Sequence, residues 1–373
     1  MLSELLSQLL VAYTIEFDNE FERDLPHRTA TFGDGGPVQF VSPSGEPVRR
    51  PWLASLAMWS NFMRYVSPEG TPLDQLAGMP ANRAGLERWG YIFISPERLV
   101  KPTRAGRLAQ AGWRRLEGMV DQRWAERFGA DVIADLTSSL RGMVREVGDA
   151  GAGLPRYLPM VGYADGMRTK YRDLRDTGLP LAEPEDLDLS ALLSQVLLGF
   201  TLEYESTAKL PLPICANTLR AIGEEGVRAS DIPLLASVSR EGVASSLGFL
   251  ERHGYIEVGH DPSGRRGKYT RSTPRGAKTR DGRQKLAAQI ERAWSERFGA
   301  DVIQSLRAST EHLLKARTAE GEPTLALGLR PYPGGWRSRN PYLAQTKAFL
   351  SDPAAHLPRH PMVLHRGGYP DGS

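Results

Sequence analysis

The chain has 373 residues, of which 40% are hydrophobic and 24% are charged, and its formal net charge is +3. These values are ordinary for a soluble globular protein, no apolar run approaches the roughly 18 to 20 residues that cross a bilayer, and the first residues lack the basic region of a signal peptide. One cysteine, Cys215, excludes a disulfide framework and a cysteine-cluster zinc site. We therefore expect a cytoplasmic protein without membrane contact, in which the location of positive charge matters more than its sum.

The first half of the chain is expected to be helical apart from one small β-hairpin. Apolar spacing predicts the order helix, helix, short helix, helix, two-stranded wing and long helix, over residues 2–22, 53–65, 71–79, 83–89, 90–101 and 106–145. Thr71, followed by Pro72 and Asp74, is interpreted as the N-cap of the short helix. The Gly- and Pro-rich residues 23–52 predict a long loop or β-arm.

The second half is expected to repeat this order without the long loop. Its predicted helices cover residues 189–204, 214–225, 230–236, 239–253 and 276–316, and its predicted wing strands cover 254–258 and 268–273. The sequence Asp261-Pro-Ser-Gly264 is a turn signal between the two strands.

Three internal matches indicate that the chain is a duplication. They are ERFGADVI at 126–133 and 296–303, LLSQ at 5–8 and 192–195, and LPR followed by a GYxDG end from Leu154 and from Leu357. Eight consecutive identical residues are very improbable by chance, so the repeats decide the domain organisation. We expect two domains, residues 1–166 and 189–373, joined by a linker over 167–188, and each domain is long enough to bury its own core.

The fourth helix and the wing of the second half carry a recognisable motif. The helix ends in Leu250-Glu-Arg-His-Gly-Tyr-Ile256, the wing contains Asp261-Pro-Ser-Gly-Arg-Arg266, and the next helix starts at Thr273-Pro-Arg-Gly276. This pattern resembles the winged helix-turn-helix of the MarR family of transcription regulators. The first half matches only in part, through Leu86-Glu-Arg-Trp-Gly-Tyr-Ile92 and Thr103-Arg-Ala-Gly106.

The resemblance implies a mainly α fold with small β-wings (α+β). In such a fold two winged helix-turn-helix domains would form an intramolecular pseudo-dimer, with the first and last helices of each half packed together. A chain built in this way is expected to be a monomer that acts as a pseudo-dimer.

The residues of the second half also suggest DNA binding without the family name. Val243, Leu247 and Leu250 fall on one face of the fourth helix, and the opposite face carries small and polar residues that can enter a major groove. Nine basic residues and one acid lie between Gly264 and Lys285, which is typical of a phosphate-binding surface. The predicted contacts to double-stranded DNA are Ser239, Arg240, Glu241, Ala244, Ser245, Arg265, Arg266, Lys268 and Arg271. The alternative is a solvated basic face, or a winged helix that binds protein.

The first half is expected to read DNA less well. Between its third helix and Gly90 it is five residues shorter than the second half, and Pro80 falls at the turn. Its wing, residues 95–102, lacks the paired arginines and carries only Arg98 and Lys101.

Other candidate sites are weaker. A small-molecule pocket is hypothesised between five aromatic side chains of the first half, although aromatic residues at helical spacing more often form core: Trp52, Trp59, Phe62, Tyr65 and Trp89. His356, His360 and His365 lie in a Pro-rich stretch and are not expected to bind a metal. No nucleophile elbow, phosphate-binding loop or zinc-protease motif is found, so we expect no cofactor, no metal and no catalytic residues.

The leading hypothesis is therefore a DNA-binding transcriptional regulator that responds to a small aromatic or apolar ligand. The alternative is a protein that binds or sequesters small molecules on the same scaffold, using the aromatic loops at 32–52 and 332–342. An enzyme such as the DNA glycosylases built from tandem winged helices is disfavoured, because their Q-x-Q signature is absent from this sequence.

Overall fold

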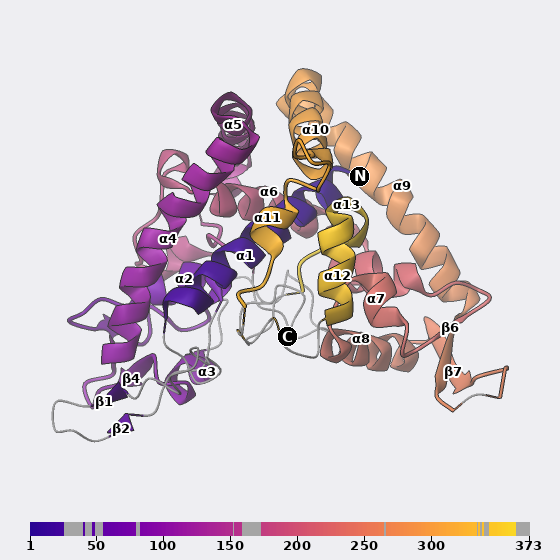
Figure 1. Cartoon of the computed structure of the whole chain (residues 1–373), viewed down its shortest axis with the longest axis horizontal. Helices are drawn as coiled ribbons and strands as arrows, with labels where there is room; N and C mark the ends of the chain where they lie inside the picture. The colour runs from indigo at the N-terminus through magenta and orange to yellow at the C-terminus, as the bar shows by residue number, and fades with distance from the viewer. Residues whose placement is uncertain are drawn as a thin grey trace.

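The computed structural model describes residues 1–25, 40–41, 47–48, 55–79, 83–151, 153–158, 173–264, 266–333, 335, 338 and 343–362. Within these ranges the protein is mainly helical, with three small antiparallel sheets. Figure 1 shows an inverted V, with the tips of α5 and α10 at its apex and one three-stranded sheet at each lower corner. None of the described helices is long and apolar enough to cross a membrane.

The first half contains five α-helices, a 3-10 turn and five short strands among its described residues. In chain order they are α1 (Leu2–Asp24), β1 (Phe40–Val41), β2 (Pro47–Val48), α2 (Leu56–Asn61), η1 (Met63–Tyr65), β3 (Thr71–Pro72), α3 (Arg83–Arg88), β4 (Ile92–Ile94), β5 (Leu99–Pro102), α4 (Arg104–Phe128) and α5 (Ala130–Gly151). Strands β1 and β2 pair inside the predicted loop or β-arm.

The second half contains equivalent elements and a C-terminal extension. After η3 (Leu174–Thr177) and η4 (Pro184–Asp186), it consists of α6 (Leu189–Thr207), η5 (Ile214–Thr218), η6 (Leu219–Ala221), β6 (Val227–Arg228), α7 (Ile232–Ala236), α8 (Arg240–Arg252), β7 (Ile256–His260), β8 (Lys268–Ser272), α9 (Pro274–Phe298) and α10 (Ala300–Lys315). The extension comprises α11 (Ala326–Leu329), α12 (Leu343–Ser351) and α13 (Pro353–His356).

The two three-stranded sheets have the same strand order. The first is β3-β5-β4 and the second is β6-β8-β7, and all pairs are antiparallel. The sequence predicted only the two wing strands of each sheet. In the first half the prediction was wrong, because Thr71 does not cap a helix: it starts β3, its hydroxyl donates to the Tyr65 carbonyl at 2.6 Å, and it accepts from the Ser67 N–H.

The last helix of each half was also predicted wrongly, as one long helix. Gly129 and Gly299, the glycines of the repeated ERFGADVI segments, have φ values of 98° and 93° and break the helix into two. Glycine adopts this conformation without the steric cost of a Cβ. The chain therefore turns back at each glycine, and α5 packs on α4 as α10 packs on α9.

The entry to α4 and the entry to α9 have the same geometry. Thr103 caps α4 by accepting the N–H of Gly106 at 3.0 Å, and Thr273 caps α9 by accepting the N–H of Gly276 at 3.1 Å. Each threonine hydroxyl also donates to the carbonyl of the glycine that precedes the wing, at 2.6 and 2.8 Å. The wing is thereby fixed to the first turn of the long helix in both halves.

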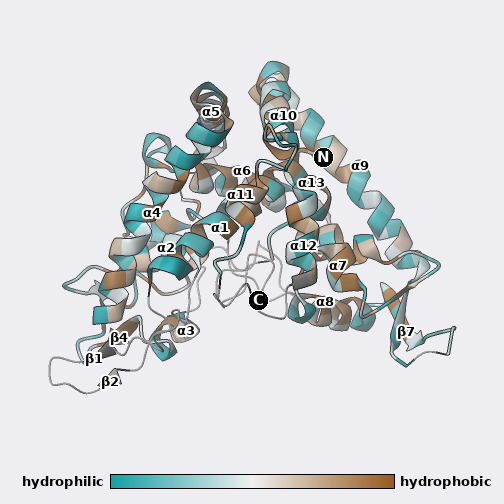
Figure 2. Ribbon diagram, viewed as in Figure 1, coloured by the Kyte–Doolittle hydropathy of each residue, from teal (hydrophilic) through white to brown (hydrophobic). Residues whose placement is uncertain are grey.

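Helices α1 and α6 lie at the centre and belong to both halves. Helix α1 packs on α4 of its own half and on α10 of the other, and α6 packs on α9 of its own half and on α5 of the other. Their apolar residues join one continuous core, while a second core lies around α7, α8 and β7. Figure 2 shows hydrophobic residues gathered where α1, α6 and α11 meet.

The LLSQ repeat of α1 binds the closing segment of the second half. Ser7 Oγ donates to the Pro358 carbonyl at 3.0 Å, and Gln8 Nε2 donates to the Ala354 carbonyl at 2.6 Å. All of these groups lie at buried or partly buried positions, where an unmade hydrogen bond is costly.

The LLSQ repeat of α6 binds the closing segment of the first half in return. Ser194 Oγ accepts the N–H of Leu158 at 2.8 Å, and Gln195 Nε2 donates to the Leu154 carbonyl at 3.2 Å. The two repeats found in the sequence, LLSQ and LPR, are therefore partners across the molecule.

Candidate nucleic-acid interface

Helix α8 presents one apolar and one polar face, as the sequence predicted. Val243 and Leu250 are buried, whereas Glu241, Ala244 and Ser245 are exposed. Because the exposed side chains on this face are short, the helix backbone can approach another surface closely.

Ser239 does not belong to this exposed face. It is fully buried, and its hydroxyl caps α8 by accepting the N–H of Gly242 at 3.0 Å. The prediction of Ser239 as a direct DNA contact was therefore wrong, because its side chain is buried and its hydroxyl group caps the first turn of α8.

The wing formed by β7 and β8 carries exposed cations. Arg266, Lys268 and Arg271 are exposed, and they form no ion pair with any residue that the structure describes. Arg240, at the start of α8, is exposed as well. Arg265 lies outside the described residues.

One of the two acidic residues of the wing is neutralised locally, and the other, Glu257, is exposed opposite Arg271 in the strand register. Asp261 is buried, pairs with the Arg228 guanidinium at 2.7 Å and accepts the Ser263 N–H and hydroxyl. The Ser263 hydrogen bonds, followed by the charge of Arg228, lower the pKa of Asp261. Asp261 thus shapes the turn while the cations of the wing remain exposed.

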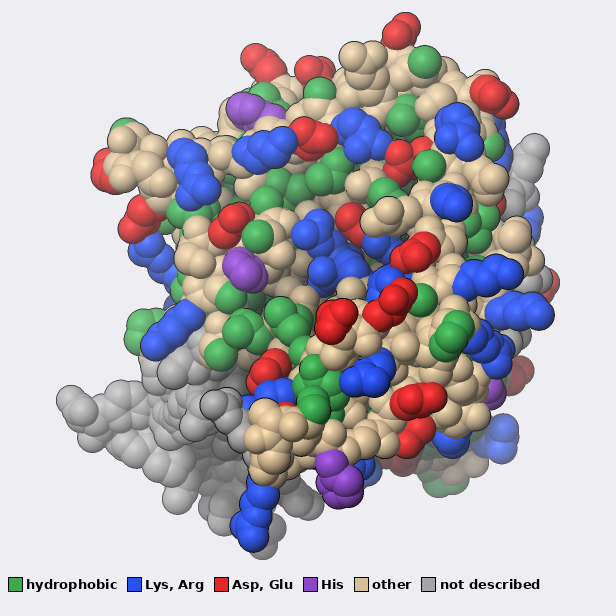
Figure 3. Space-filling model, turned by 90° about the vertical axis from the view of Figure 1, so that its right-hand side faces the viewer, with side chains coloured by type: hydrophobic (Ala, Val, Ile, Leu, Met, Phe, Trp, Pro, Cys, Tyr) green, Lys and Arg blue, Asp and Glu red, His purple; other side chains and the backbone are tan. Residues whose placement is uncertain are grey.

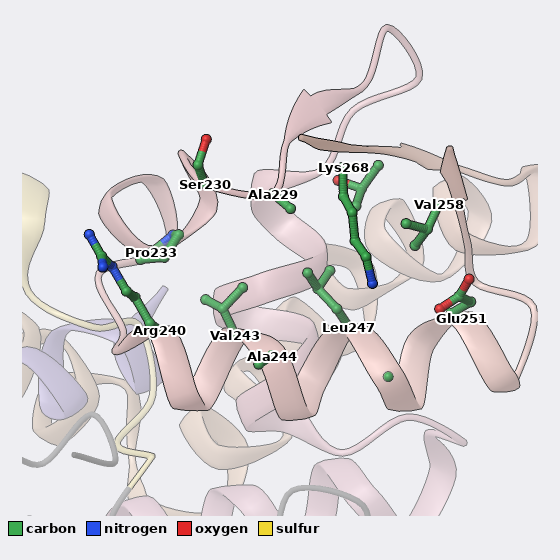
Figure 4. Close-up of a pocket in the computed structure, with 12 residues that line it drawn as sticks. Ala229, Ser230, Pro233, Arg240, Val243, Ala244, Leu247, Glu251, Val258 and Lys268 are labelled. Carbon is green, nitrogen blue, oxygen red and sulfur yellow. The ribbon is translucent and has the colours of Figure 1, made fainter. Parts of the chain in front are cut away.

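A cavity of about 580 Å³ separates α8 from the wing (Figure 4). Its apolar part is formed by Val243, Leu247 and Val258, and the Lys268 side chain extends from β8 towards α8. The complete lining is Ala229, Ser230, Pro233, Arg240, Val243, Ala244, Leu247, Gly248, Glu251, Val258, Lys268 and Thr270. The volume falls within the range of small-molecule sites. Sequence reasoning missed this cavity, because it is formed only when the wing folds beside the helix.

The aromatic residues proposed as a ligand pocket are packed core. Trp59 and Phe62 are fully buried and Trp89 is buried, while Tyr65 is partly buried. The Trp59 ring stacks on Trp113 at 5.5 Å between centroids, and its Nε1 donates to a carboxylate on α4. This packing agrees with the alternative interpretation of these aromatics as core. Trp52 lies outside the described residues.

An ionisable cluster lies where α6 begins. Asp121 accepts the Tyr13 hydroxyl at 2.8 Å, and both Glu117 and Asp188 lie close enough to act on its charge. Burial, followed by the charge of Asp188, raises the pKa of Asp121 to about 7. Burial also raises the pKa of Glu117. Arg64 pairs with Glu117 and lies 3.9 Å from Asp188, which offsets part of this negative charge.

The histidines give no sign of a metal site in the described part of the chain. His360 is fully buried, and its ring bonds to the Thr201 hydroxyl at 2.9 Å and to the Pro361 carbonyl at 3.0 Å. Burial lowers the pKa of His360 to about 4, so the ring is neutral near pH 7. No group of three or more His, Cys, Asp or Glu residues suited to a metal ion occurs among the described residues. His365 lies outside them.

The surface of the second half has mixed charge. Figure 3 shows Lys and Arg side chains interspersed with Asp and Glu on this face, without one continuous basic patch. Exposed cations lie on the wing, at the start of α8 and on α9, where Arg275, Lys278 and Lys285 are exposed.

Comparison with protein-family models, curated proteins and solved structures finds no match to this chain.

Proposed function

We propose that this protein is a sequence-specific DNA-binding regulator, in which two MarR-like winged helix-turn-helix halves form an intramolecular pseudo-dimer. The observation that carries the proposal is the pairing of a helix that exposes short side chains with a neighbouring wing that exposes cations. Helix α8 would enter the major groove, and Arg266 and Arg271 would lie against phosphates.

The internal architecture supports the pseudo-dimer part of the proposal. Each central helix packs on a terminal helix of the opposite half, and the LLSQ repeats bind the LPR segments in both directions. These reciprocal contacts are those that two subunits related by a twofold axis would make.

The dependence of affinity on salt tests the proposal. Each phosphate neutralised contributes about 0.9 to the slope of log K against log salt, so Arg266→Ala with Arg271→Ala should flatten the slope by roughly 2. The loss should be similar for specific and random duplexes, because phosphate contacts carry no sequence information. Ser245→Ala should instead change the preference at one base pair by about 1 to 3 kcal/mol and leave the slope unchanged.

The matched control is Arg98→Ala with Lys101→Ala in the wing of the first half. It removes the same number of positive charges from the wing of the other half, and we expect a much smaller loss of affinity. An unchanged affinity and slope for Arg266→Ala with Arg271→Ala would contradict the proposed function.

A second proposal concerns the ligand that controls binding. The cavity between α8 and the wing combines apolar walls with two cations, Arg240 and Lys268, and one acid, Glu251, a lining with a net positive charge that suits a small carboxylic acid with an apolar or aromatic body. A ligand here would lie between the two elements proposed to touch DNA. Benzoate is therefore expected to raise the melting temperature of the protein and to weaken its binding to DNA, and Leu247→Trp, which narrows the cavity at its apolar wall, should reduce both effects. Equal benzoate effects on Leu247→Trp and the wild type would place the ligand elsewhere.

A further inference from the structure

The two halves present unequal surfaces at the two lower corners of the molecule (Figure 1). Helix α8 has 13 residues, and its counterpart α3 is described over Arg83–Arg88. Because Met79 is not helical, α3 is at least four residues, or about 6 Å, shorter than α8. A shorter helix offers fewer positions from which side chains can reach base edges.

The exposed residues of α3 are also less suited to DNA. Its exposed face includes Glu87, which lies 3.9 Å from the Arg83 guanidinium in an ion pair. Arg88 lies over the Trp89 ring, at 5.7 Å from its centroid. The cations of α3 are thus already engaged within the protein.

The wing of the first half is shorter and carries an acid at its tip. Strands β4 and β5 have three and four residues, whereas β7 and β8 have five each. The tip is a tight turn in which Arg98 N–H donates to the Ser95 carbonyl at 2.9 Å. Glu97 and Arg98 are both exposed there, and a hydrogen bond from Ser95 lowers the pKa of Glu97, so the charge of Arg98 at this tip is offset by an adjacent carboxylate.

The wing of the second half exposes more cations than acids. Of its two acids, Asp261 is buried against Arg228 and Glu257 is exposed opposite Arg271 in the strand register, while Arg266, Lys268 and Arg271 are exposed and form no ion pair with a described residue. The charge of the wing and the lengths of the helix and strands therefore all favour DNA binding by the second half.

We infer that one molecule reads a single half-site, through α8 and the β7–β8 wing, and that its DNA target is an asymmetric sequence and not an inverted repeat. This inference rests on the DNA-binding function proposed above. In a symmetric dimer of winged helices, two equal surfaces read two half-sites about one helical turn apart. Here the second position would meet the shorter α3 and the β4–β5 wing, whose tip carries one acid beside one base. The first half then acts as a scaffold that packs on the DNA-binding second half through α1, α5 and the closing segments.

Selection from random DNA tests the inference. The full chain is mixed with duplexes that contain a random segment of about 30 base pairs, about three helical turns, and the retained duplexes are amplified and sequenced. We expect one asymmetric block of enriched bases. An enriched inverted repeat with half-site centres about 10 base pairs apart would overturn the inference while supporting DNA binding itself.

A second measurement uses the enriched block. Duplexes are made with one copy, and with two inverted copies whose centres are about 10 base pairs apart. We expect one chain to bind each copy, and the affinity per copy on the two duplexes should agree within about twofold. The inference would be overturned if one chain bound both copies at once, with an affinity more than about tenfold higher than for the single copy.

Two outcomes separate this inference from the proposed function. If the wild type retains no more DNA than the variant Arg266→Ala with Arg271→Ala does, DNA binding itself is refuted, and the inference is refuted with it. If Arg98→Ala with Lys101→Ala in the first half weakens binding as much as Arg266→Ala with Arg271→Ala does in the second, DNA binding stands but both halves read it, and the inference is refuted.

Discussion

At the scale of single residues, Asp121 is a carboxyl group whose setting affects stability near neutral pH. Its pKa is raised from 3.8 to about 7 by burial and by the charge of Asp188, with Glu117 adding to the effect. Tyr13 and the start of α6 donate hydrogen bonds to it, and these lower the pKa in part. In the unfolded chain the same carboxyl ionises near its ordinary value. Between about pH 4 and pH 7 the folded state therefore binds more protons than the unfolded state.

We predict that this difference destabilises the protein as pH rises. Because the folded pKa is the higher one, stability from Asp121 is present at low pH and is lost as pH rises through about 7. Asp121→Asn keeps the shape and cannot ionise, so it should lose less stability than the wild type between about pH 5 and pH 8, by about 1 to 3 kcal/mol. Urea unfolding at both pH values measures this difference. Asp135→Asn, at an exposed position of α5, is the control, and parallel profiles for Asp121→Asn and the wild type would refute the prediction.

At the scale of secondary-structure elements, the fold depends on close contact between each wing and the long helix that follows it. A Cβ built on Gly106 would lie 2.0 Å from the Tyr91 carbonyl oxygen, and one built on Gly276 would lie 2.0 Å from the Tyr255 carbonyl oxygen. Both contacts are with backbone, which cannot rotate away. Glycine is therefore required where α4 and α9 begin.

We predict that Gly106→Ala and Gly276→Ala each destabilise the protein by about 2 to 4 kcal/mol, because the helix must move away from the wing. Thermal or urea unfolding measures the loss. Gly276→Ala should also weaken DNA binding by more than its effect on folding explains, since it displaces the wing beside α8.

The controls for this prediction lie in the same two helices. No heavy atom lies within 4 Å of a Cβ built on Gly118 of α4 or Gly282 of α9. Alanine at these positions should stabilise the helix by up to about 1 kcal/mol. A loss of stability at Gly118 equal to that at Gly106 would mean that the close contact is not the cause.

The sequence predicted those elements whose signals act locally. Ser239 and Thr273 mark the starts of α8 and α9 because their hydroxyl groups cap the helices, and the Asp-Pro-Ser-Gly turn marks the wing tip. The prediction that Thr71 caps a helix was wrong because a Thr-Pro pair can begin a helix or an edge strand, and only its pairing with β5 decides between them. The helix break at Gly129 was not predicted because a glycine inside a helical pattern is usually tolerated at a cost of about 1 kcal/mol.

The candidate site was predicted in part for the same reason. The exposed and buried faces of α8 follow from helical periodicity, so Val243 and Ser245 were assigned correctly to opposite faces. The cavity beside Leu247 and the packed state of Trp59 depend on which elements meet in space, and no local pattern contains that information.

At the scale of the whole molecule, the interface between the halves is internal to one chain. Helices α1 and α6 bury most of their residues, 18 of 23 and 14 of 19, and the reciprocal bonds of Gln8 and Gln195 are made within the same molecule. A surface that would otherwise require a second subunit is already covered.

We predict that the protein is a monomer at micromolar concentration. Light scattering should give a mass near 41.2 kDa. A stable mass of twice this value would show that a further surface associates. The exposed side chains of Leu234 and Leu235 on α7 would then be the first to replace by serine, with Leu327 on α11 as a comparison.

The bond between Ser7 and the Pro358 carbonyl spans 351 positions of the chain and has a consequence for biosynthesis. A ribosome adds about 5 to 20 residues per second, so α1 waits roughly 20 to 70 seconds before its last partner is made. During that interval α6 is synthesised first and α10 later, and until both are made the apolar surface of α1 is exposed to other nascent chains. The protein should therefore depend on chaperones during translation more than its modest size suggests, and the first half released alone, as residues 1–166, should aggregate.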